Sequence, residues 1–295
     1  MRILLYPLIA VLALGSFASC SDDDGPVAEP EKSRPAGGDS EEEPVGEEWI
    51  DPDFAALLRM NGIIEDPATV KPSDIVDITE IDIQYPGEIK QLTSLRGIER
   101  FHSLVRLICS DHKLTELDLS GCPELEYLDC GYNQISSIDL SKCPKLTYAD
   151  CSVNGVSEIV LDNPALEELN LAYSALASFD GAGIPAMKRL YLYTSSIESL
   201  DITKCASLEW LFCYQCRLPV LDISKNRSLT KLYAMYNPGK DYPEGRYFVI
   251  TAWFNYDSFP EEGEYTDSVW RLDDGTEVET WYVLPGETPD FSCGF

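Results

Sequence analysis

Cysteine is the residue of this chain best suited to chemistry, because a thiolate can act as a nucleophile, a metal ligand or a disulfide partner. The sequence holds ten cysteines, and Cys213 and Cys216 form a C-x-x-C string. A redox or zinc role for this string would need a helix start or a second pair of ligands nearby. Cys213 instead continues a regular series of cysteines, so we expect no such role.

Most of the cysteines recur at fixed intervals. One series is Cys109, Cys130, Cys151 and Cys213, and the other is Cys122, Cys143 and Cys205. Cysteine behaves as a small apolar residue in protein cores, so we interpret both series as buried free thiols. Neighbours on adjacent strands would be about 4.8 Å apart, farther than the Cβ atoms of a disulfide at about 3.8 Å. Cys293 belongs to neither series, and its redox state is left open.

The two histidines, His102 and His112, have no serine or cysteine at a spacing typical of a catalytic relay. The sequence also contains no G-x-S-x-G string, no H-E-x-x-H string and no phosphate-binding glycine loop. We therefore predict that the protein is not an enzyme, has no catalytic or metal-binding residues and carries no cofactor.

The charge of the chain restricts its partners. Asp and Glu number 51 against 22 Lys and Arg, which gives a formal net charge of −29. Nucleic acids and anionic lipid headgroups bind clustered Lys and Arg, so the composition argues against both as partners. It favours a partner that carries basic patches.

A period of 21 residues explains the cysteine series. The string Leu104-Val-Arg-Leu107-Ile-Cys109 returns at Leu125–Cys130 and Leu146–Cys151. Further units begin at Leu166, Met187 and Leu208, a partial unit begins at Leu229, and the unit from Leu146 is shortened to 20 residues. Apolar residues occupy the first, fourth, sixth, eleventh, fourteenth and mostly the sixteenth places. One such unit cannot bury its apolar side alone, whereas a stack of units can.

This pattern resembles the leucine-rich repeat, in the short form of internalin-like domains and of surface lipoproteins from gut Bacteroidota. The resemblance covers about residues 75–237. It implies an α/β-type repeat solenoid, a horseshoe with a parallel β-sheet on its concave face. Because leucine-rich repeats are mainly protein-recognition scaffolds, it also implies a protein or peptide partner.

The ninth place holds Asn133, Asn154 and Asn237, whose side chains are expected to bond the backbone of the turn that leaves each strand. His112 takes this place in its own unit and is expected to do the same. Ser174, Ser195 and Cys216 replace Asn in later units, which predicts less regular turns there. Gly181 replaces an apolar residue at the sixteenth place and predicts a local bend or weaker packing. The string Asn237-Pro238-Gly239 is a turn signal expected to stop the solenoid.

The third, fifth, seventh and eighth places should point away from the sheet on its concave side. The early units present an acidic and aromatic group, Tyr127, Asp129, Tyr148 and Asp150. The later units present Tyr173, Tyr191, Tyr193, Trp210, Phe212, Tyr214, Tyr233 and Tyr236. Aligned exposed aromatic side chains reduce solubility unless they bind something, so we interpret this set as a ligand-binding surface. Strand propensity alone is the competing explanation.

Two classes of ligand fit this surface at the level of sequence. The first is a protein or peptide, which Tyr and Trp contact with large, stiff side chains. The alternative is a glycan, because sugar rings stack on the same side chains, and the chain would then be an accessory lipoprotein of a polysaccharide-uptake system. A column of aspartates at the fifteenth place, including Asp118 and Asp139, is interpreted as a solvated edge in preference to a calcium site.

The rest of the chain divides into flanking segments. Residues 49–103 are predicted to form an N-terminal cap and an irregular first repeat, with a helix that begins at Asp51-Pro52 and ends near Asn61-Gly62. Residues 104–239 carry the repeats. Residues 240–295 are predicted to form a C-terminal β cap or small module, with strands around 248–254, 268–272 and 278–284.

Export signals open the chain. Residues 1–19 resemble a secretory signal peptide, and Phe17-Ala-Ser-Cys20 resembles a lipobox in which Cys20 is acylated. The acids after Cys20 resemble the export tag of Bacteroidota surface lipoproteins, and residues 20–48 are predicted to be a disordered acidic tether. We therefore expect a palmitoylated lipoprotein held on the outer membrane only through Cys20 and facing the cell exterior.

Overall fold

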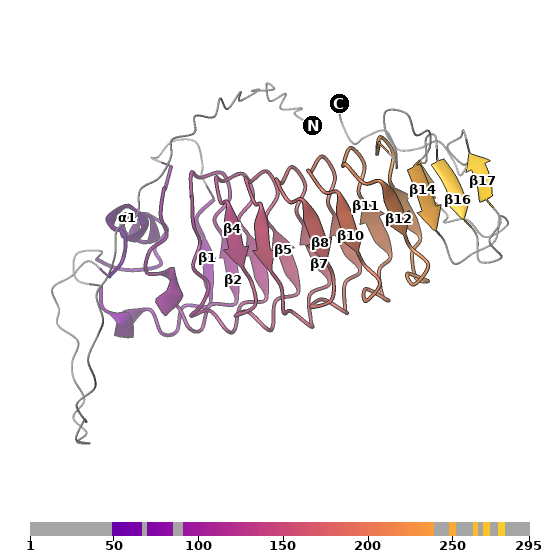
Figure 1. Cartoon of the computed structure of the whole chain (residues 1–295). Helices are drawn as coiled ribbons and strands as arrows, with labels where there is room; N and C mark the ends of the chain where they lie inside the picture. Colours follow the sequence, from indigo (N-terminus) through magenta and orange to yellow (C-terminus); the bar gives the residue numbers. More distant parts are fainter. Residues whose placement is uncertain are drawn as a thin grey trace, which may run out of the picture. The chain divides into compact units, whose positions relative to one another are not determined.

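The computed structural model describes residues 49–66, 70–84, 91–238, 248–251, 262–264, 268–271 and 277–280. The predicted signal peptide, Cys20, the tether and Cys293 lie outside these residues. Within them, each repeat forms one coil of a solenoid, with a short strand over its third to fifth places (Figure 1). Among the described residues, no helix is long and apolar enough to cross a membrane.

These first strands form a parallel nine-stranded sheet. Its members, in spatial order, are β1 (Glu80–Asp82), β2 (Arg106–Ile108), β3 (Tyr127–Asp129), β5 (Tyr148–Asp150), β7 (Glu168–Asn170), β9 (Arg189–Tyr191), β11 (Trp210–Phe212), β13 (Lys231–Tyr233) and β15 (Glu262–Glu264). The register matches equal places of successive units, so that Tyr127 faces Tyr148 and Asp129 faces Asp150. The predicted fold class, a leucine-rich-repeat solenoid with a parallel sheet, is confirmed.

The opposite side of the coils also carries short strands, over places thirteen to fifteen. They form one pair of β4 (Ser137–Asp139) and β6 (Glu158–Val160), a second pair of β8 (Ser178–Asp180) and β10 (Ser199–Asp201), and a sheet of β12 (Val220–Asp222), β14 (Phe248–Thr251), β16 (Ser268–Arg271) and β17 (Glu277–Thr280). The interruption between β6 and β8 falls in the unit that lacks one residue. The described repeats thus connect their strands by turns and strands, without helices.

The core lies between the two strand-bearing sides. The apolar places are filled by fully buried residues such as Leu107, Leu128 and Leu169, all at 0% exposure, and these belong to one continuous cluster. Burial of one such side chain contributes about 1.5–3 kcal/mol. Stacking many equivalent coils is therefore what stabilises the solenoid.

The predicted N-terminal helix is confirmed as α1 (Pro52–Met60). The Asp51 carboxylate caps it by accepting from the N–H groups of Asp53 and Phe54, and Asn61 follows its last turn. Phe54 is buried with its ring centroid 6.1 Å from that of Phe101, so α1 covers the apolar end of the first coils. Two short 3₁₀ helices, η1 (Pro72–Asp74) and η2 (Ile98–Arg100), complete this end.

The asparagines of the ninth place bridge neighbouring coils as predicted. Asn133 Oδ1 accepts from the Leu114 N–H at 3.0 Å, and its Nδ2 donates to the carbonyls of Cys109 and Cys130 at 3.0 Å each. His112 does the same with a ring: Nδ1 accepts from the Leu92 N–H at 3.2 Å, and Nε2 donates to the Ile83 carbonyl at 2.7 Å. The expected backbone role of His112 is confirmed.

The prediction of less regular turns in the later units is wrong. The eighth-place residue is left-handed in every unit, with φ between 52° and 62° at Asp111, Tyr132, Val153, Tyr173, Thr194, Gln215 and Tyr236. Cys216 keeps the turn closed because its thiol donates to the Leu192 carbonyl at 3.2 Å, the carbonyl that an asparagine would bond. The turn geometry is imposed by the stacked neighbours and not by Asn alone.

The expectation of weaker packing at Gly181 is also wrong. A Cβ there would lie 2.5 Å from Cys205 Sγ, so the sulfur occupies the space that a side chain would fill. The Gly181 N–H continues the backbone ladder by donating to the Asp201 carbonyl at 2.8 Å. The eight described cysteines are buried and free, which confirms the predicted thiols.

The sequence repeat ends at Asn237-Pro238, but the sheets continue beyond it. Asn237 Oδ1 accepts from the Leu218 N–H and its Nδ2 donates to the Cys213 carbonyl, as in earlier units. Beyond them, β14 pairs in parallel with β12, β15 with β13 and β16 with β14. The antiparallel pair of β16 and β17 matches the predicted hairpin strands, and the residues that join them lie outside the described part.

Candidate functional site

The candidate site is the outer face of the nine-stranded sheet. At the fourth place of each repeat, the middle residue of the strand, the side chain points into the core, so the side chains at the third and fifth places point outward. We define the aromatic face as the half-buried rings that project from this side: Tyr127, Tyr148, Tyr191, Tyr193, Trp210, Phe212, Tyr214 and Tyr233. All eight belong to the predicted binding set.

The third-place side chains form one continuous column. Arg106 pairs with Glu80 at 3.2 Å, and its guanidinium lies 3.9 Å from the centre of the Tyr127 ring. Tyr127 stacks in turn on Tyr148, with centroids 4.4 Å apart and planes 5° from parallel. Burial, followed by the nearby Asp150, raises the pKa of Tyr148.

The same column continues through the later units. Arg189 Nε donates to Glu168 at 2.6 Å, and its guanidinium lies 5.5 Å from the Trp210 ring centre. On the other side of that ring, Lys231 Nζ lies 4.7 Å from the centre. Trp210 is therefore held between two cations, an arrangement that is stabilising because the ring face is electron-rich.

The fifth and seventh places form two further aromatic columns. Phe212 is stacked between Tyr191, at 5.0 Å and 26°, and Tyr233, at 4.6 Å and 8°. Tyr193 stacks on Tyr214 at 4.8 Å and 7°. The ring faces in these columns are turned toward each other along the solenoid. What they offer a partner is therefore their edges.

Tyr173 and Tyr236, which also belong to the predicted set, follow the strands of their units. They occupy the left-handed eighth place, in the turn after the strand, and are 52% and 57% exposed. Tyr173 meets Tyr193 edge to face at 5.7 Å. Tyr132 has the same place and is 54% exposed, but sequence reasoning did not include it. Its position in the repeat was the signal that could have found it.

The two predicted carboxylates of the site lie together at the fifth place. Asp129 Oδ1 accepts from the Gly131 N–H at 3.1 Å, and Asp150 Oδ1 from the Ser152 N–H at 2.8 Å. Asn170 caps the next turn in the same way and donates to Asp150 Oδ2 at 2.9 Å. Burial raises the pKa of Asp129, and Asp150 and Asp111 add to the rise.

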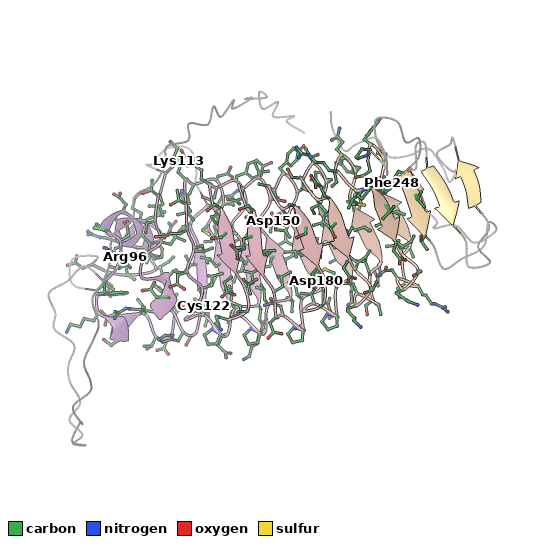
Figure 2. All side chains as sticks on the ribbon, viewed as in Figure 1. Arg96, Lys113, Cys122, Asp150, Asp180 and Phe248 are labelled. Carbon is green, nitrogen blue, oxygen red and sulfur yellow. The ribbon has the colours of Figure 1, made fainter. Side chains whose placement is uncertain are left out.

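The fifteenth-place aspartates cap turns on the opposite side (Figure 2 labels Asp150 of one side and Asp180 of the other). Asp139 and Asp180 accept from N–H groups two residues later at 2.8 and 2.9 Å. Hydrogen bonds from Ser141 lower the pKa of Asp139. Across the described residues, no group of three or more His, Cys, Asp or Glu could hold a metal ion.

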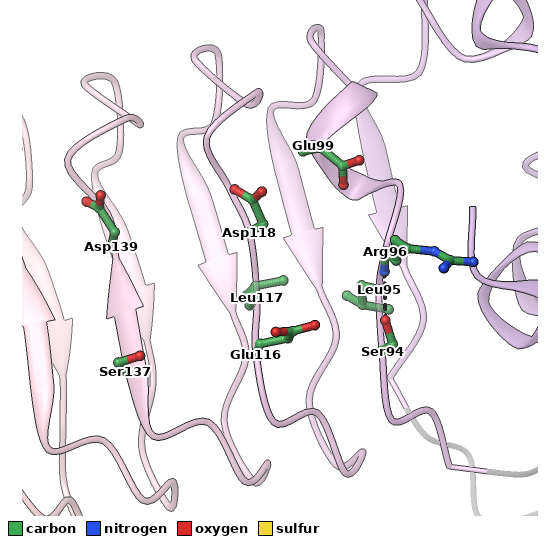
Figure 3. Close-up of a pocket in the computed structure, with 9 residues that line it drawn as sticks. All are labelled: Ser94, Leu95, Arg96, Glu99, Glu116, Leu117, Asp118, Ser137 and Asp139. Carbon is green, nitrogen blue, oxygen red and sulfur yellow. Dashed lines mark hydrogen bonds between the residues drawn. The ribbon is translucent and has the colours of Figure 1, made fainter. Parts of the chain in front are cut away.

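One pocket lies on this opposite side, near the N-terminal end (Figure 3). Glu99, Asp118 and Asp139 line it, but each of them accepts from a backbone N–H close in sequence. Figure 3 shows the guanidinium of Arg96 directed away from these carboxylates. None of the residues that line this pocket belongs to the aromatic face.

The stacked coils, the asparagine ladder and the parallel sheet define a leucine-rich-repeat solenoid. The chain is similar to InlJ from Listeria monocytogenes, whose functional domain includes a cysteine ladder: 22% identity, TM-score 0.53, over 69% of this chain and 45% of that one. It is also similar to an internalin C2 from Listeria monocytogenes, with 15% sequence identity and a TM-score of 0.52, over 69% of this chain and 94% of that one.

A third similar structure is the plant peptide hormone receptor RGFR1 in complex with RGF2, at 17% identity and TM-score 0.52, over 68% of this chain and 34% of that one. The chain thus spans less than half of the InlJ and RGFR1 chains that it matches. No protein-family model matches the sequence, and no curated protein does. At these identities the similarity shows the fold alone.

Proposed function

We propose that this chain is a surface-exposed lipoprotein whose solenoid binds a protein or peptide partner through the aromatic face. The observation that carries the proposal is the stacking of half-buried rings in two adjacent columns, at the fifth and seventh places of the later units. Rings held by their neighbours lose little freedom when a partner binds. The similar plant receptor is described in complex with a peptide hormone, which agrees with this use of the fold.

Ring orientation favours a polypeptide over a glycan on this face. A sugar stacks on an open ring face, and here the faces contact each other or the cations of Arg106, Arg189 and Lys231. Ring edges and tyrosine hydroxyls instead suit apolar side chains and backbone amides. We therefore place the partner's apolar side chains against the edges of Tyr191, Phe212 and Tyr233.

A glycan is the second candidate, at a different row of side chains. Tyr132, Tyr173 and Tyr236 are the aromatic residues most exposed in the described part of the chain. Their left-handed backbone directs them outward from the turns. Tyr173→Ala and Tyr236→Ala would weaken glycan binding if this row were the site.

The test is a comparison of ring and control variants of the full chain. Binding to a peptide array and to a glycan array is measured for the wild type, for Tyr191→Ala, Trp210→Ala and Tyr173→Ala, and for the controls Val160→Ala and Val220→Ala. The two valines are exposed on the opposite side. Loss of a central aromatic contact costs about 2 kcal/mol or more, or roughly thirtyfold in affinity.

Folding of each variant is checked by its thermal midpoint. Peptide binding that survives both ring substitutions, in variants that remain folded, would show that the partner uses another surface. Binding to glycans alone, lost in Tyr173→Ala, would favour the second candidate.

The anchor and location form a separate part of the proposal. The apolar leader, Cys20 and the acidic residues that follow Cys20 support it. Acyl chains contribute about 0.8 kcal/mol per buried methylene, so more than one chain gives durable attachment. Mass spectrometry of the N-terminal peptide should show acylated Cys20, and Cys20→Ala should leave the outer-membrane fraction.

A further inference from the structure

Charge is distributed unevenly along the outer face of the nine-stranded sheet. In β1 to β7, the third and fifth places hold five acids and one base: Glu80, Asp82, Asp129, Asp150, Glu168 and Arg106. In β9 to β13, the same places hold two bases and no acid: Arg189 and Lys231, with Tyr191, Trp210, Phe212 and Tyr233. Between β1 and β13 the face therefore changes from acidic to aromatic.

Two of the acids are neutralised within the chain. Glu80 pairs with Arg106, and Glu168 pairs with Arg189. None of the ion pairs among the described residues includes Asp129, Asp150 or their neighbour Asp111. These three carboxylates form a negative patch for which the described residues supply no cation.

The patch is electrostatically unfavourable as it stands. Asp129 and Asp150 are direct partners in adjacent strands, where like charges destabilise each other. Both are half-buried, which weakens the screening by water. The raised pKa of Asp129 has burial, Asp150 and Asp111 among its causes. A positive group brought by a partner would relieve this repulsion and gain charge-assisted hydrogen bonds.

We propose that the outer face of the nine-stranded sheet binds one extended polypeptide segment, with a Lys or Arg of the segment against Asp129, Asp150 and Asp111 and its apolar side chains against the ring edges of β9 to β13. This inference rests on the proposed function and specifies the partner. It commits to a polypeptide because a neutral glycan has no cation for the patch.

The length of the segment follows from the sheet. From β3 to β13 there are five strand spacings, or roughly 24 Å at about 4.8 Å each. An extended chain advances about 3.3 Å per residue, so about seven residues reach from the carboxylates to Tyr233. A peptide of three residues cannot contact both ends.

The probe is a phage-displayed library of random peptides of about twelve residues, selected on the full chain. The key variant is Asp129→Asn with Asp150→Asn. It should fold, because Asn170 already caps its turn from the same place with an amide. The matched control is Asp139→Asn with Asp180→Asn, which changes the charge equally and keeps the same kind of turn cap on the opposite side.

Selected peptides should contain a Lys or Arg several residues away from aromatic or aliphatic residues. The key variant should bind them roughly tenfold to hundredfold more weakly, the range of one hydrogen bond to a charged group. Added salt should weaken binding to the wild type more than to the variant. The control should bind as the wild type does.

Selected peptides without basic residues, or equal losses in the key variant and the control, would overturn this inference. If such peptides still lose affinity in Tyr191→Ala, the aromatic face remains a binding surface and only the charge assignment is wrong. If no peptide is sensitive to any ring of the face, or only glycans bind, the proposed function fails as well.

Discussion

Asn154 is expected to contribute several kcal/mol to the free energy of unfolding, whereas Ser174, at the same place of the next coil, is expected to contribute almost nothing. In the Asn154→Ala variant, the Ile135 N–H loses its acceptor at 2.9 Å, and the Cys151 carbonyl loses its donor at 3.2 Å. The Cys130 and Ser152 carbonyls also lose the amide, but they keep Asn133 Nδ2 and the Tyr132 N–H as donors. All the bonds of Asn154 are buried.

The expected cost follows from the groups left without a partner. A buried donor or acceptor whose partner is removed costs about 1–3 kcal/mol, so two of them give roughly 2–6 kcal/mol. Single domains are stable by only about 5–15 kcal/mol in total. Ser174→Ala is the matched control, because its buried hydroxyl has no hydrogen-bond partner among the described residues. Its removal should change stability by less than about 0.5 kcal/mol, or raise it slightly.

Urea unfolding followed by circular dichroism measures both variants against the wild type. The slope with denaturant reports the surface exposed and shows whether the same structure unfolds in each. If Asn154→Ala and Ser174→Ala cost the same, or if Asn154→Ala costs less than about 1 kcal/mol, the asparagine ladder does not stabilise the coils in the way described.

Three further outcomes can be checked in the same material. Burial lowers the pKa of His112, so the stabilising contribution of this residue is present above the ordinary histidine pKa of 6.5 and is lost as the pH falls. The free energy of unfolding should therefore drop more between pH 7.5 and pH 5 in the wild type than in His112→Asn, which keeps the ladder bonds. Equal drops in the two proteins would contradict this. Val153 has φ 52°, so Val153→Asn should stabilise the fold by about 1 kcal/mol in urea unfolding, whereas Val160→Asn in β6 should not. Burial raises the pKa of Cys122 and Cys143 to about 12 and that of Cys205 to about 11, so iodoacetamide at pH 8 should label these thiols only after denaturation, as counted by mass spectrometry.

Some features were readable from sequence because they depend only on which way a side chain points. The 21-residue period placed Leu107, Leu128 and Leu169 inward and Tyr127 and Tyr148 outward, and the structure agrees. The cap of α1 was equally local, since Asp51 bonds backbone groups two and three residues away. Periodicity and capping are near-neighbour properties, which a single chain displays in its order of residues.

Other features needed the stacked neighbours. Cys122 was predicted only as core, yet its thiol donates to the Ile98 carbonyl at 3.4 Å, the same kind of bond that Asn163 makes to Leu140. The left-handed backbone at Tyr173 also needed the structure, because no glycine marks that turn in the sequence. Each of these depends on atoms about 21 residues away along the chain.

By itself, the sequence determined the repeating coil with its strands and its buried apolar core. It also determined which aromatic and acidic residues point outward, because a fixed period dictates the direction of every side chain. The tertiary structure decided that the rings stack face to face and offer their edges, that Trp210 lies between two cations, and that Asp129 and Asp150 receive no ion-pair partner from the described residues. Rotamers and charge pairing depend on distances between coils, and those distances exist only once the coils are stacked.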